Sequence, residues 1–382
     1  MHRRMLAEVA LETHAADVSV GTVEALDFLP GSVRRAVVDE EQLIALTVQR
    51  CRRPAYELVD GRTLVVKRYD HGDLRLHGLD TTIGCPVAAA SLEDRITELR
   101  EDRSHGASWM ARQAVEALIE LVDEHEGSCE NLLDELRQAG RRLAAARPGV
   151  GAIAGTVGRL LASSRYESHL EPDVLRQVVS EEAQALTEGR IRAPASIAIQ
   201  LRERIDGATV LTHSNSATVR EALSHDEPAK VLCTVSSPVE EGRTLLAELV
   251  DGGIDAELVE DADAPDRVKE VDVVLVGADT VFRDGTICNK IGTIPLARAA
   301  HDADVPVVVA AELIKLAPVP GAQAPDLADF ERELFELIPA DLITEVVTEE
   351  GAFAPDDVAS LADRVPFLRE GYELIAPLAA NR

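Results

Sequence analysis

The sequence predicts an α/β protein in which a helical N-terminal layer is followed by a doubly wound parallel-sheet domain. Two changes of pattern along the chain carry this prediction. Apolar residues recur at three- and four-residue spacing between residues 92 and 205, as they do in packed amphipathic helices. Beyond residue 205, short β-rich runs alternate with helical segments, which is typical of parallel strands joined by crossover helices. A small extra α+β module is predicted ahead of both parts.

Residues 1–95 are expected to form this separate module. Residues 1–80 hold 11 basic and 13 acidic side chains, a balance of −2, so −27 of the total charge of −29 falls on the rest of the chain. Residues 55–59 and 63–68 flank Asp60-Gly61 and predict a β-hairpin, because Asp-Gly suits a two-residue turn. No catalytic signature is found in the module, and no role is assigned to it.

The rest of the chain divides into a helical domain, residues 96–200, and a sheet domain, residues 201–382. Apolar periodicity supports helices at residues 109–122, 132–145, 150–161 and 174–186. Short β-rich runs support strands at residues 208–211, 230–234, 255–259, 271–276, 307–310 and 342–348. Ligands of such sheets lie at the carboxyl ends of the strands, so the residues after each strand are the candidates for a site.

The composition indicates a soluble, cytoplasmic protein. Among 382 residues, 46% are hydrophobic, yet no run approaches the roughly 20 apolar residues that cross a bilayer. The basic start of the chain leads into Glu8 and Glu12 rather than an apolar signal core. Five scattered cysteines without C-x-x-C spacing indicate reduced thiols rather than disulfides or a zinc site.

The charge balance bears on the salt concentration of the cell as well as on the kind of ligand. Asp and Glu total 68 against 39 Lys and Arg, and the net charge of −29 repels a phosphate backbone, which excludes broad nucleic-acid binding. Such acidity with almost no lysine is typical of a halophilic protein, with an ordinary acidic protein as the alternative. Because lysine is so scarce, a lysine inside a motif carries more weight.

Polar motifs follow three of the predicted strands. Residues 212–219, Thr-His-Ser-Asn-Ser-Ala-Thr-Val, open a helix and could form an anion site, although an ordinary Ser216 N-cap explains them equally well. Asp279 ends an apolar run, Lys290 follows the same run at a helix start, and Lys315 lies at a third strand end. Lysines, a carboxylate and helix starts at one edge predict a small phosphorylated ligand. The alternative is that each lysine only pairs with a surface carboxylate.

These motifs resemble one superfamily. Gly-Ala-Asp at 277–279, Asp-Gly at 284–285 and Asn-Lys-Ile-Gly-Thr at 289–293 have the spacing found in the regulatory α, β and δ subunits of translation initiation factor 2B. The superfamily also contains methylthioribose-1-phosphate isomerase and archaeal ribose-1,5-bisphosphate isomerase, and the similarity runs from about residue 99 to about residue 371. It implies a helical part followed by a Rossmann-like domain that pairs into homodimers.

The resemblance implies a sugar-phosphate pocket that needs no metal or redox cofactor. Asp279 matches the isomerases' catalytic acid/base, and residues 104–108 look like their Arg-Gly-Ala loop with His105 in the place of the Arg. Substrate or phosphate contacts thereby fall on His105, Gly106, Ala107, Arg147, Asn289, Lys290 and Lys315, together with the helix start at Ser216.

The sequence departs from the isomerase pattern at the second catalytic position. Ser214 stands where the isomerases have a cysteine, and a hydroxyl is a poor base compared with a thiol whose pKa can be lowered. His213 is expected to face away from Ser214, because neighbouring side chains of an extended chain point to opposite faces. Val235 and Ser237 replace a Glu and an Arg of the family. Cys288 could supply a thiol. The favoured alternative is that Cys288 is only a small side chain packed in the core.

Two principal hypotheses follow, with a third behind them. The first is a regulatory protein similar to initiation factor 2B that binds a sugar phosphate or a nucleotide monophosphate without efficient turnover. The second is an aldose-ketose isomerase that acts on ribose 1,5-bisphosphate or a related 1-phosphorylated pentose, with Asp279 as acid/base. In the third, the N-terminal module carries the main activity. Expected partners are the phosphorylated pentose or nucleotide and a homodimer or higher homo-oligomer, with initiation factor 2 as a further candidate and no membrane.

Overall fold

The computed structural model describes residues 91–165 and 171–375, and five strands between residues 34 and 76. The chain divides into two compact units, Met1–Ala88 and Ala89–Arg382. In the first unit, β1 (Arg34–Val37) pairs antiparallel with β2 (Ala45–Val48). A second antiparallel sheet contains β3 (Tyr56–Val59), β4 (Arg62–Arg68) and β5 (Leu74–Leu76). Val59 pairs with Arg62, which confirms the predicted hairpin; any helix of this module lies outside the described residues.

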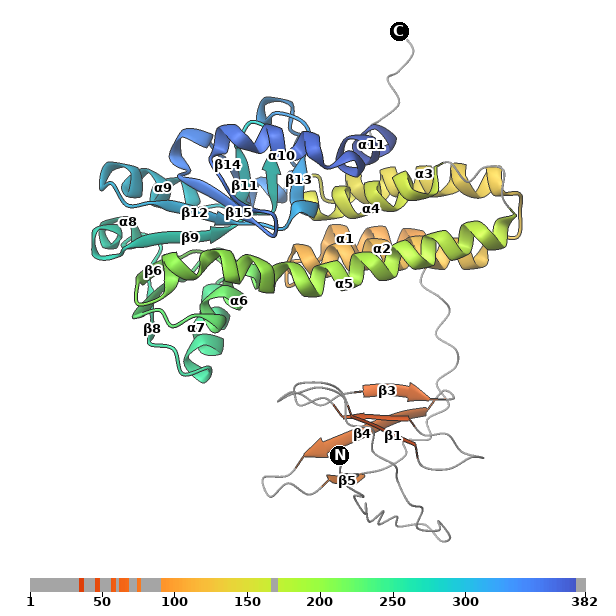
Figure 1. Ribbon diagram of the computed structural model, residues 1–382, viewed down its shortest axis with the longest axis horizontal. Coiled ribbons are helices and arrows are strands. Elements are labelled where there is room, and N and C mark those ends of the chain that lie inside the picture. Colours follow the sequence, from red (N-terminus) through yellow and green to blue (C-terminus); the bar gives the residue numbers. More distant parts are fainter. Residues whose placement is uncertain are drawn as a thin grey trace, which may run out of the picture. The chain divides into compact units, whose positions relative to one another are not determined.

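The second unit begins with a layer of helices, as the apolar periodicity predicts (Figure 1). They are α1 (Leu92–Glu101), α2 (Ala107–Glu124), α3 (Cys129–Ala146), α4 (Gly151–Ser164) and α5 (Pro172–Ile205). Ser91 starts α1 with a capping box, in which its Oγ accepts from the Asp94 N–H and the Asp94 carboxylate accepts from the Ser91 N–H. The core of the layer is rich in leucine and alanine and includes Leu99, Leu118 and Leu136.

The predicted strands form a seven-stranded sheet next to the helical layer. Its order is β16-β15-β12-β9-β6-β7-β8, parallel throughout except for the antiparallel edge strand β16. The strands are β6 (Thr209–Thr212), β7 (Lys230–Thr234), β8 (Ala256–Val259), β9 (Val273–Gly277), β12 (Val307–Ala310), β15 (Glu345–Thr348) and β16 (Gly351–Phe353). Six of these match predicted runs, and β16 has no predicted counterpart.

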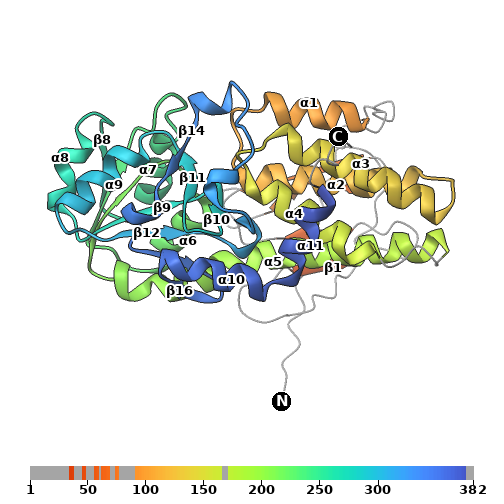
Figure 2. The ribbon, with the colours of Figure 1, turned by 90° about the horizontal axis from the view of Figure 1, so that it is seen from above.

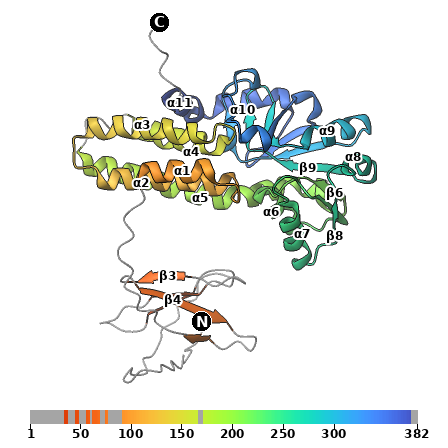
Figure 3. The ribbon, with the colours of Figure 1, turned by 180° about the vertical axis from the view of Figure 1, so that it is seen from behind.

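Helices cover both faces of this sheet, as its two-sided apolar strands require. Val210 and Leu275 pack with α6 (Ala217–His225), α7 (Gly242–Asp251) and the end of α5, which runs from the helical layer to the sheet (Figure 3). Leu211 and Val276 point to the other face, where the covering helices are α8 (Ala264–Arg267), α9 (Thr293–Asp302), α10 (Val358–Arg364) and α11 (Pro366–Ile375).

A second, four-stranded sheet contains two strands from the motif region at residues 279–293. Its order is β13-β10-β11-β14, formed by β10 (Thr280–Phe282), β11 (Ile287–Lys290), β13 (Leu316–Ala317) and β14 (Phe335–Ile338). The sequence patterns did not predict this sheet, because its strands are two to four residues long and too short to show a period.

Glycines of α4 bring the helical layer against the sheet part. A Cβ on Gly155 would lie 1.9 Å from the carbonyl oxygen of Ile314, so only glycine permits this approach. A Cβ on Gly158 would similarly lie 2.9 Å from the backbone of Gly371, where α11 lies on α4 (Figure 2). The backbone just before Lys315 is thereby held against α4.

Candidate functional site

Lys290, Lys315 and Asp279 are brought near one another by three different elements. Lys290 ends β11, Asp279 follows β9, and Lys315 ends a 3₁₀ turn, η2 (Leu313–Lys315). Both lysine side chains are only 7% exposed. The two ammonium groups and the Arg147 guanidinium all act electrostatically on the Asp279 carboxylate. Residues that the motifs placed at separate strand ends therefore form one cluster.

Each cation of this cluster is paired with a carboxylate that the sequence patterns did not single out. Lys290 Nζ lies 2.9 Å from Glu241 Oε1, and Lys315 Nζ lies 2.8 Å from Glu312 Oε2. Arg147 Nε lies 3.4 Å from Oε1 of Glu331, which is fully buried. Each lysine thus has a carboxylate partner, as the alternative interpretation expects, but Glu241 is half-buried and Glu312 is buried. Glu312 offered a signal in its i,i+3 spacing to Lys315; Glu241 and Glu331 offered none.

Asp279 is the carboxylate of the cluster without a hydrogen bond to its side chain from any described residue. Its backbone is held on both sides, since its N–H donates to the Cys288 carbonyl (2.9 Å) and its carbonyl accepts from the Gly151 N–H (3.0 Å). Burial raises the pKa of Asp279 to about 6, while Lys315, Lys290 and Arg147 oppose that shift and Glu241 adds to it. A group with this pKa can both give and take a proton near neutral pH.

Ser214 lies directly beside Glu241. The backbone of Ser214 has a positive φ of 71°, and its N–H donates to Ser236 Oγ (2.7 Å). Its Oγ donates to Glu241 Oε1, also at 2.7 Å. The same carboxylate oxygen therefore receives the Ser214 hydroxyl and the Lys290 ammonium.

The His213 ring makes its hydrogen bonds to residues other than Ser214. Its Nε2 donates to the carbonyl of Ile291 (2.9 Å), so its Nδ1 must accept from the hydroxyl of Thr234 (2.7 Å). Burial lowers the pKa of His213 and keeps the ring neutral. The ring is thus a structural link between strand ends and does not act on Ser214.

Cys288 belongs to an apolar cluster and not to the charged one. Its side chain is 1% exposed and packs with Phe282 and Ala317. Burial, together with the charges of Asp279 and Glu331, raises the pKa of Cys288 well above the ordinary value of a thiol. The favoured interpretation of a small buried filler is in keeping with this setting, and the thiol is unsuited to act as a base.

Arg147 and the turn at residues 102–106 meet at a third side of the cluster. Arg147, 2% exposed, donates to the carbonyls of Leu99 (3.3 Å) and Asp102 (2.7 Å), and burial lowers its pKa. The carboxylate of Asp102 lies 2.7 Å from Nδ1 of His105, whose ring stacks on Trp109 at 4.0 Å. His105 is exposed, whereas the Arg147 guanidinium is buried, and its Nε lies near Glu331 without a hydrogen bond to a described residue.

Gly106 and Ala107 begin α2 in this turn. Gly106 is the N-cap residue of α2 and has no heavy atom within 4 Å of the position of a Cβ, which leaves open space beside it. Ala107 is buried against the helical core. The first N–H groups of α2 therefore lie next to an open position, as an anion contact requires.

Arg103, in the same turn, was not singled out by the sequence patterns. Its guanidinium lies 4.2 Å from the centre of the Phe330 ring, and the Arg147 guanidinium lies 5.0 Å from the same ring. Arg103 is exposed and donates only to the carbonyls of Arg100 and Asp102, with no ion pair to a described carboxylate. It is an unneutralised cation at the edge of the cluster.

Asn289 and Ser216 both serve helix starts beside the cluster. Asn289, 5% exposed, donates from Nδ2 to Thr293 Oγ1 (3.1 Å), at the first residue of α9. Ser216 caps α6, and its Oγ accepts from the Val219 N–H at 3.4 Å. A Cβ on Gly277 would lie 2.6 Å from Ser216 Oγ, so the α6 start closely approaches the end of β9. Both predicted residues therefore stand next to the cluster in structural roles.

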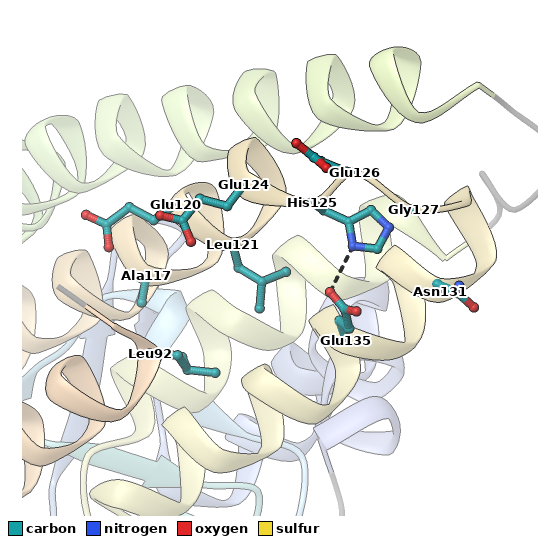
Figure 4. A pocket seen from close by; sticks show the side chains of 10 residues that line it. All are labelled: Leu92, Ala117, Glu120, Leu121, Glu124, His125, Glu126, Gly127, Asn131 and Glu135. Carbon is teal, nitrogen blue, oxygen red and sulfur yellow. Dashed lines mark hydrogen bonds and ion pairs between the residues drawn. The ribbon is translucent and has the colours of Figure 1, made fainter. Parts of the chain in front are cut away.

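A groove of about 520 Å³ lies elsewhere, among α1, α2 and α3 (Figure 4). His125 contacts Glu135 there with a Nδ1···Oε2 distance of 2.9 Å. The groove is also lined by Glu120, Glu124 and Glu126 and contains none of the predicted site residues. Its carboxylates disfavour a phosphorylated ligand, so the cluster around Asp279 remains the candidate site.

Neither a group of metal-ligating side chains nor a membrane-spanning helix is found among the described residues. No three His, Cys, Asp or Glu side chains among them gather as ligands of a metal ion. None of the helices in the described ranges is both long enough and apolar enough to cross a membrane.

Comparison with known proteins relates this architecture to one family. Residues 103–327 match the model of the initiation factor 2 subunit family. A putative translation initiation factor eIF-2B subunit 2-like protein of Pyrococcus horikoshii is 31% identical over 276 residues, which cover 68% of this chain and 95% of that protein. Ribose 1,5-bisphosphate isomerase of Archaeoglobus fulgidus is 30% identical over 282 residues, 68% of this chain and 88% of the enzyme.

Relatives also occur in salt-loving archaea and among solved structures. Ribose 1,5-bisphosphate isomerase of Haloferax volcanii is 28% identical over 293 residues, which cover 69% of this chain and 89% of the enzyme. The crystal structure of a Pyrococcus horikoshii translation initiation factor eIF-2B superposes with a TM-score of 0.60 at 27% identity, over 69% of this chain and 97% of that chain. A tetrameric eIF2B β2δ2 complex from C. thermophilum shares the fold, with a TM-score of 0.61 at 23% identity, over 72% of this chain and 93% of that chain.

Proposed function

This chain belongs to the initiation factor 2 subunit family, and we propose that its charged cluster binds a phosphorylated pentose, free or within a nucleotide monophosphate. The observation that carries the proposal is the pair of buried lysines, Lys290 and Lys315, which both act electrostatically on Asp279. Buried ammonium groups are stabilised by anions, and only five lysines occur in the chain. Two of them are placed in this cluster.

The charges of the cluster make the binding depend on a proton. Arg147, Lys290 and Lys315 contribute three positive charges, and their partners Glu241, Glu312 and Glu331 contribute three negative ones. The ionised Asp279 adds a further negative charge, which would repel a phosphate. Since its pKa is about 6, Asp279 can become neutral at little expense of free energy when the phosphate arrives. We therefore expect proton uptake on binding.

Arg103 supplies the remaining positive charge for a phosphate. It lies beside Arg147 at the same Phe330 ring and has no carboxylate partner among the described residues. A planar guanidinium can donate two parallel hydrogen bonds to phosphate oxygens. Arg103 thus offsets the loss of the loop arginine that His105 replaces.

In the leading form of this proposal, the protein is regulatory. It binds the ligand but has no thiol that could convert it efficiently. Ser214 has no thiol, and the thiol of Cys288 is buried in an apolar cluster. The site would then bind the ligand without converting it, and occupancy of the site would be the regulatory signal. Assembly as a homodimer or higher homo-oligomer and contact with initiation factor 2 belong to the same proposal. The mass in solution, measured by light scattering in molar potassium chloride, tests the assembly.

Isomerisation is the second candidate, and one observation favours it. The pKa of Asp279, about 6, suits a group that gives and takes protons at neutral pH, as general acid-base catalysis requires. Ribose 1,5-bisphosphate isomerases are among the relatives. A second base is required for this reaction.

Calorimetric titration of the full chain in molar potassium chloride tests binding. Ribose 1,5-bisphosphate, ribose 5-phosphate and AMP are the probes. Lys290→Gln and Lys315→Gln should each weaken binding at least about tenfold, since each removes a charge-assisted contact. Lys230→Gln is the matched control, because Lys230 pairs with Glu257 on the surface (2.7 Å). Equal affinity in all of these variants would contradict the proposal.

A further inference from the structure

We propose that Glu241 is the base that the site lacks at Ser214, so that the site converts a 1-phosphorylated aldopentose to the ketose as well as binding it. This inference rests on the proposed sugar-phosphate binding and goes beyond it. It assigns to Glu241 a catalytic role and to Ser214 the role of a positioning residue.

The two carboxylate oxygens of Glu241 have different surroundings. Oε1 accepts from the Ser214 hydroxyl at 2.7 Å and lies 2.9 Å from the Lys290 ammonium. Oε2 is buried and has no hydrogen-bond partner among the described residues. One oxygen therefore fixes the orientation of the carboxylate, and the other is an open acceptor. A buried acceptor left without a donor is destabilising unless a ligand meets it.

The surroundings of Glu241 favour its negative charge and fix the orientation of its carboxylate. It is the N-cap residue of the ten-residue helix α7, where the helix dipole favours a negative charge. Lys290 adds a positive charge from β11. Ser214 approaches from the end of β6 in a left-handed backbone conformation, with its N–H bound to Ser236. Groups at two separate strand ends, those of β6 and β11, therefore fix this carboxylate.

Glu241 and Asp279 stand close enough to influence each other electrostatically. Glu241 is one of the groups that raise the pKa of Asp279, and Lys290 acts on both. Two carboxylates in different surroundings can divide the acid and base roles between them. Asp279, without a hydrogen bond to its side chain from the described residues, is suited to hold a proton, and Glu241, paired with Lys290, is suited to be the anion.

A second buried acceptor lies next to Ser214 in the chain. The side-chain oxygen of Asn215, Oδ1, is buried and has no hydrogen-bond partner among the described residues. Together with Glu241 Oε2 it offers two acceptors, and the hydroxyl groups of a pentose are donors. The chemistry of the orphaned atoms thus matches a polyol ligand.

The reaction balances with these two carboxyl groups alone. The C1–O4 bond of the sugar ring breaks as Asp279 gives its proton to O4. Glu241 Oε2 takes the proton from C2, and the electron pair of that C–H bond forms the C1=C2 double bond. Glu241 then returns the proton to C1, while the O2–H proton goes to Asp279 and C2 becomes a carbonyl. Both carboxyl groups end in their starting forms, and no oxidant or reductant is needed. A carboxylate base serves other aldose-ketose isomerases in the same step.

The test separates turnover from binding in the full chain. Phosphorus NMR follows the conversion of ribose 1,5-bisphosphate in molar potassium chloride, and calorimetry measures its affinity. Glu241→Gln should lower the rate about 100-fold or more, which is the range of a lost general base, while the dissociation constant changes less than about threefold. Glu241→Asp should retain part of the rate.

Glu240→Gln is the matched control. Glu240 is the neighbouring residue but pairs with Arg243 at 2.8 Å, and both side chains are more than half exposed. Its rate and affinity should equal those of the natural chain. Ser214→Ala should lower the rate less than Glu241→Gln does. In deuterium oxide, the natural chain should incorporate deuterium at C1, because the proton on Glu241 exchanges with solvent before its return.

Each other outcome overturns the inference in a distinguishable way. Binding without conversion by the natural chain refutes the catalytic role and leaves the proposed binding function intact. Conversion that survives Glu241→Gln refutes Glu241 as the base. Loss of affinity together with rate in Glu241→Gln shows that the carboxylate only positions Lys290. Absence of binding in the natural chain refutes the proposed function and this inference together.

Discussion

The Lys315 ammonium lies 2.8 Å from Glu312 Oε2, and both side chains are only 7% exposed. Glu312 also accepts from the Thr218 hydroxyl at 2.7 Å, which ties the start of α6 to the turn that carries Lys315. The Lys315 charge and these hydrogen bonds lower the pKa of Glu312 despite its burial. A ligand that approaches Lys315 therefore meets a cation that is already oriented by its partner.

Breaking this buried pair is expected to destabilise the protein strongly. Glu312→Gln leaves the buried Lys315 ammonium without this ion-pair partner, and Lys315→Met does the same to the Glu312 carboxylate. Each change should lower the free energy of unfolding by about 3–5 kcal/mol. The double variant should lose clearly less than the sum of the two. Guanidinium denaturation of all four proteins measures this coupling. Simple additivity would show that the two groups do not interact.

Stability should depend on pH through Asp279. Its pKa is about 6 in the folded protein against an ordinary value of 3.8, so the folded state favours the protonated form. The contribution of this group to stability is full below pH 3.8 and is lost as the pH rises through 6.

Asp279→Asn removes that loss and should raise the free energy of unfolding by about 3 kcal/mol at pH 8, with little change near pH 4. Denaturant titrations at the two pH values measure the difference. If Asp279→Asn were less stable than the natural chain at pH 8, the attraction of the nearby cations for the ionised Asp279 would exceed the cost of burying its charge.

The approach of α4 to the turn at Lys315 should not tolerate a methyl group. In Gly155→Ala the new Cβ would lie 1.9 Å from the Ile314 carbonyl oxygen, so the backbone before Lys315 must move. We expect a loss of more than about 2 kcal/mol in stability, as in overpacked cores, together with weaker sugar-phosphate binding.

Gly189→Ala provides the matched control for this close approach. Gly189 lies inside α5 and has no heavy atom within 4 Å of a Cβ position. This change should stabilise the helix by about 0.5–1 kcal/mol and leave binding unaltered. Equal thermal stability of the two alanine variants would contradict the contact.

Arg103 should contribute to affinity and little to stability. Arg103→Gln removes an exposed guanidinium that has no carboxylate partner among the described residues, and affinity for ribose 5-phosphate should fall about tenfold. Arg100→Gln is the control, since Arg100 is exposed in the last turn of α1. Calorimetry gives the affinities, and thermal unfolding should show both variants close to the natural chain. An unchanged affinity in Arg103→Gln would exclude this contact.

The sequence by itself determined the order of the long helices α2 to α5 and of six strands of the seven-stranded sheet, and the region of the candidate site. Periodicity over long helices is a strong local signal, and the apolar runs of the parallel sheet, buried on both faces, are equally clear. The scarcity of lysine directed attention to Lys290 and Lys315, and the run before Asp279 placed that carboxylate at a strand end. These properties depend on neighbours in the chain.

Only the tertiary structure decided which groups meet. Glu241, Glu312 and Glu331 became the partners of the three cations because loops from different strands converge at one edge. The burial of Arg147 and the apolar setting of Cys288 arise in the same way, from packing against distant segments. The strands of the four-stranded sheet are too short to show a period, and pairing across distant segments holds them. Local sequence cannot encode the ion pairs and burial of this site, since both arise when distant segments come into contact.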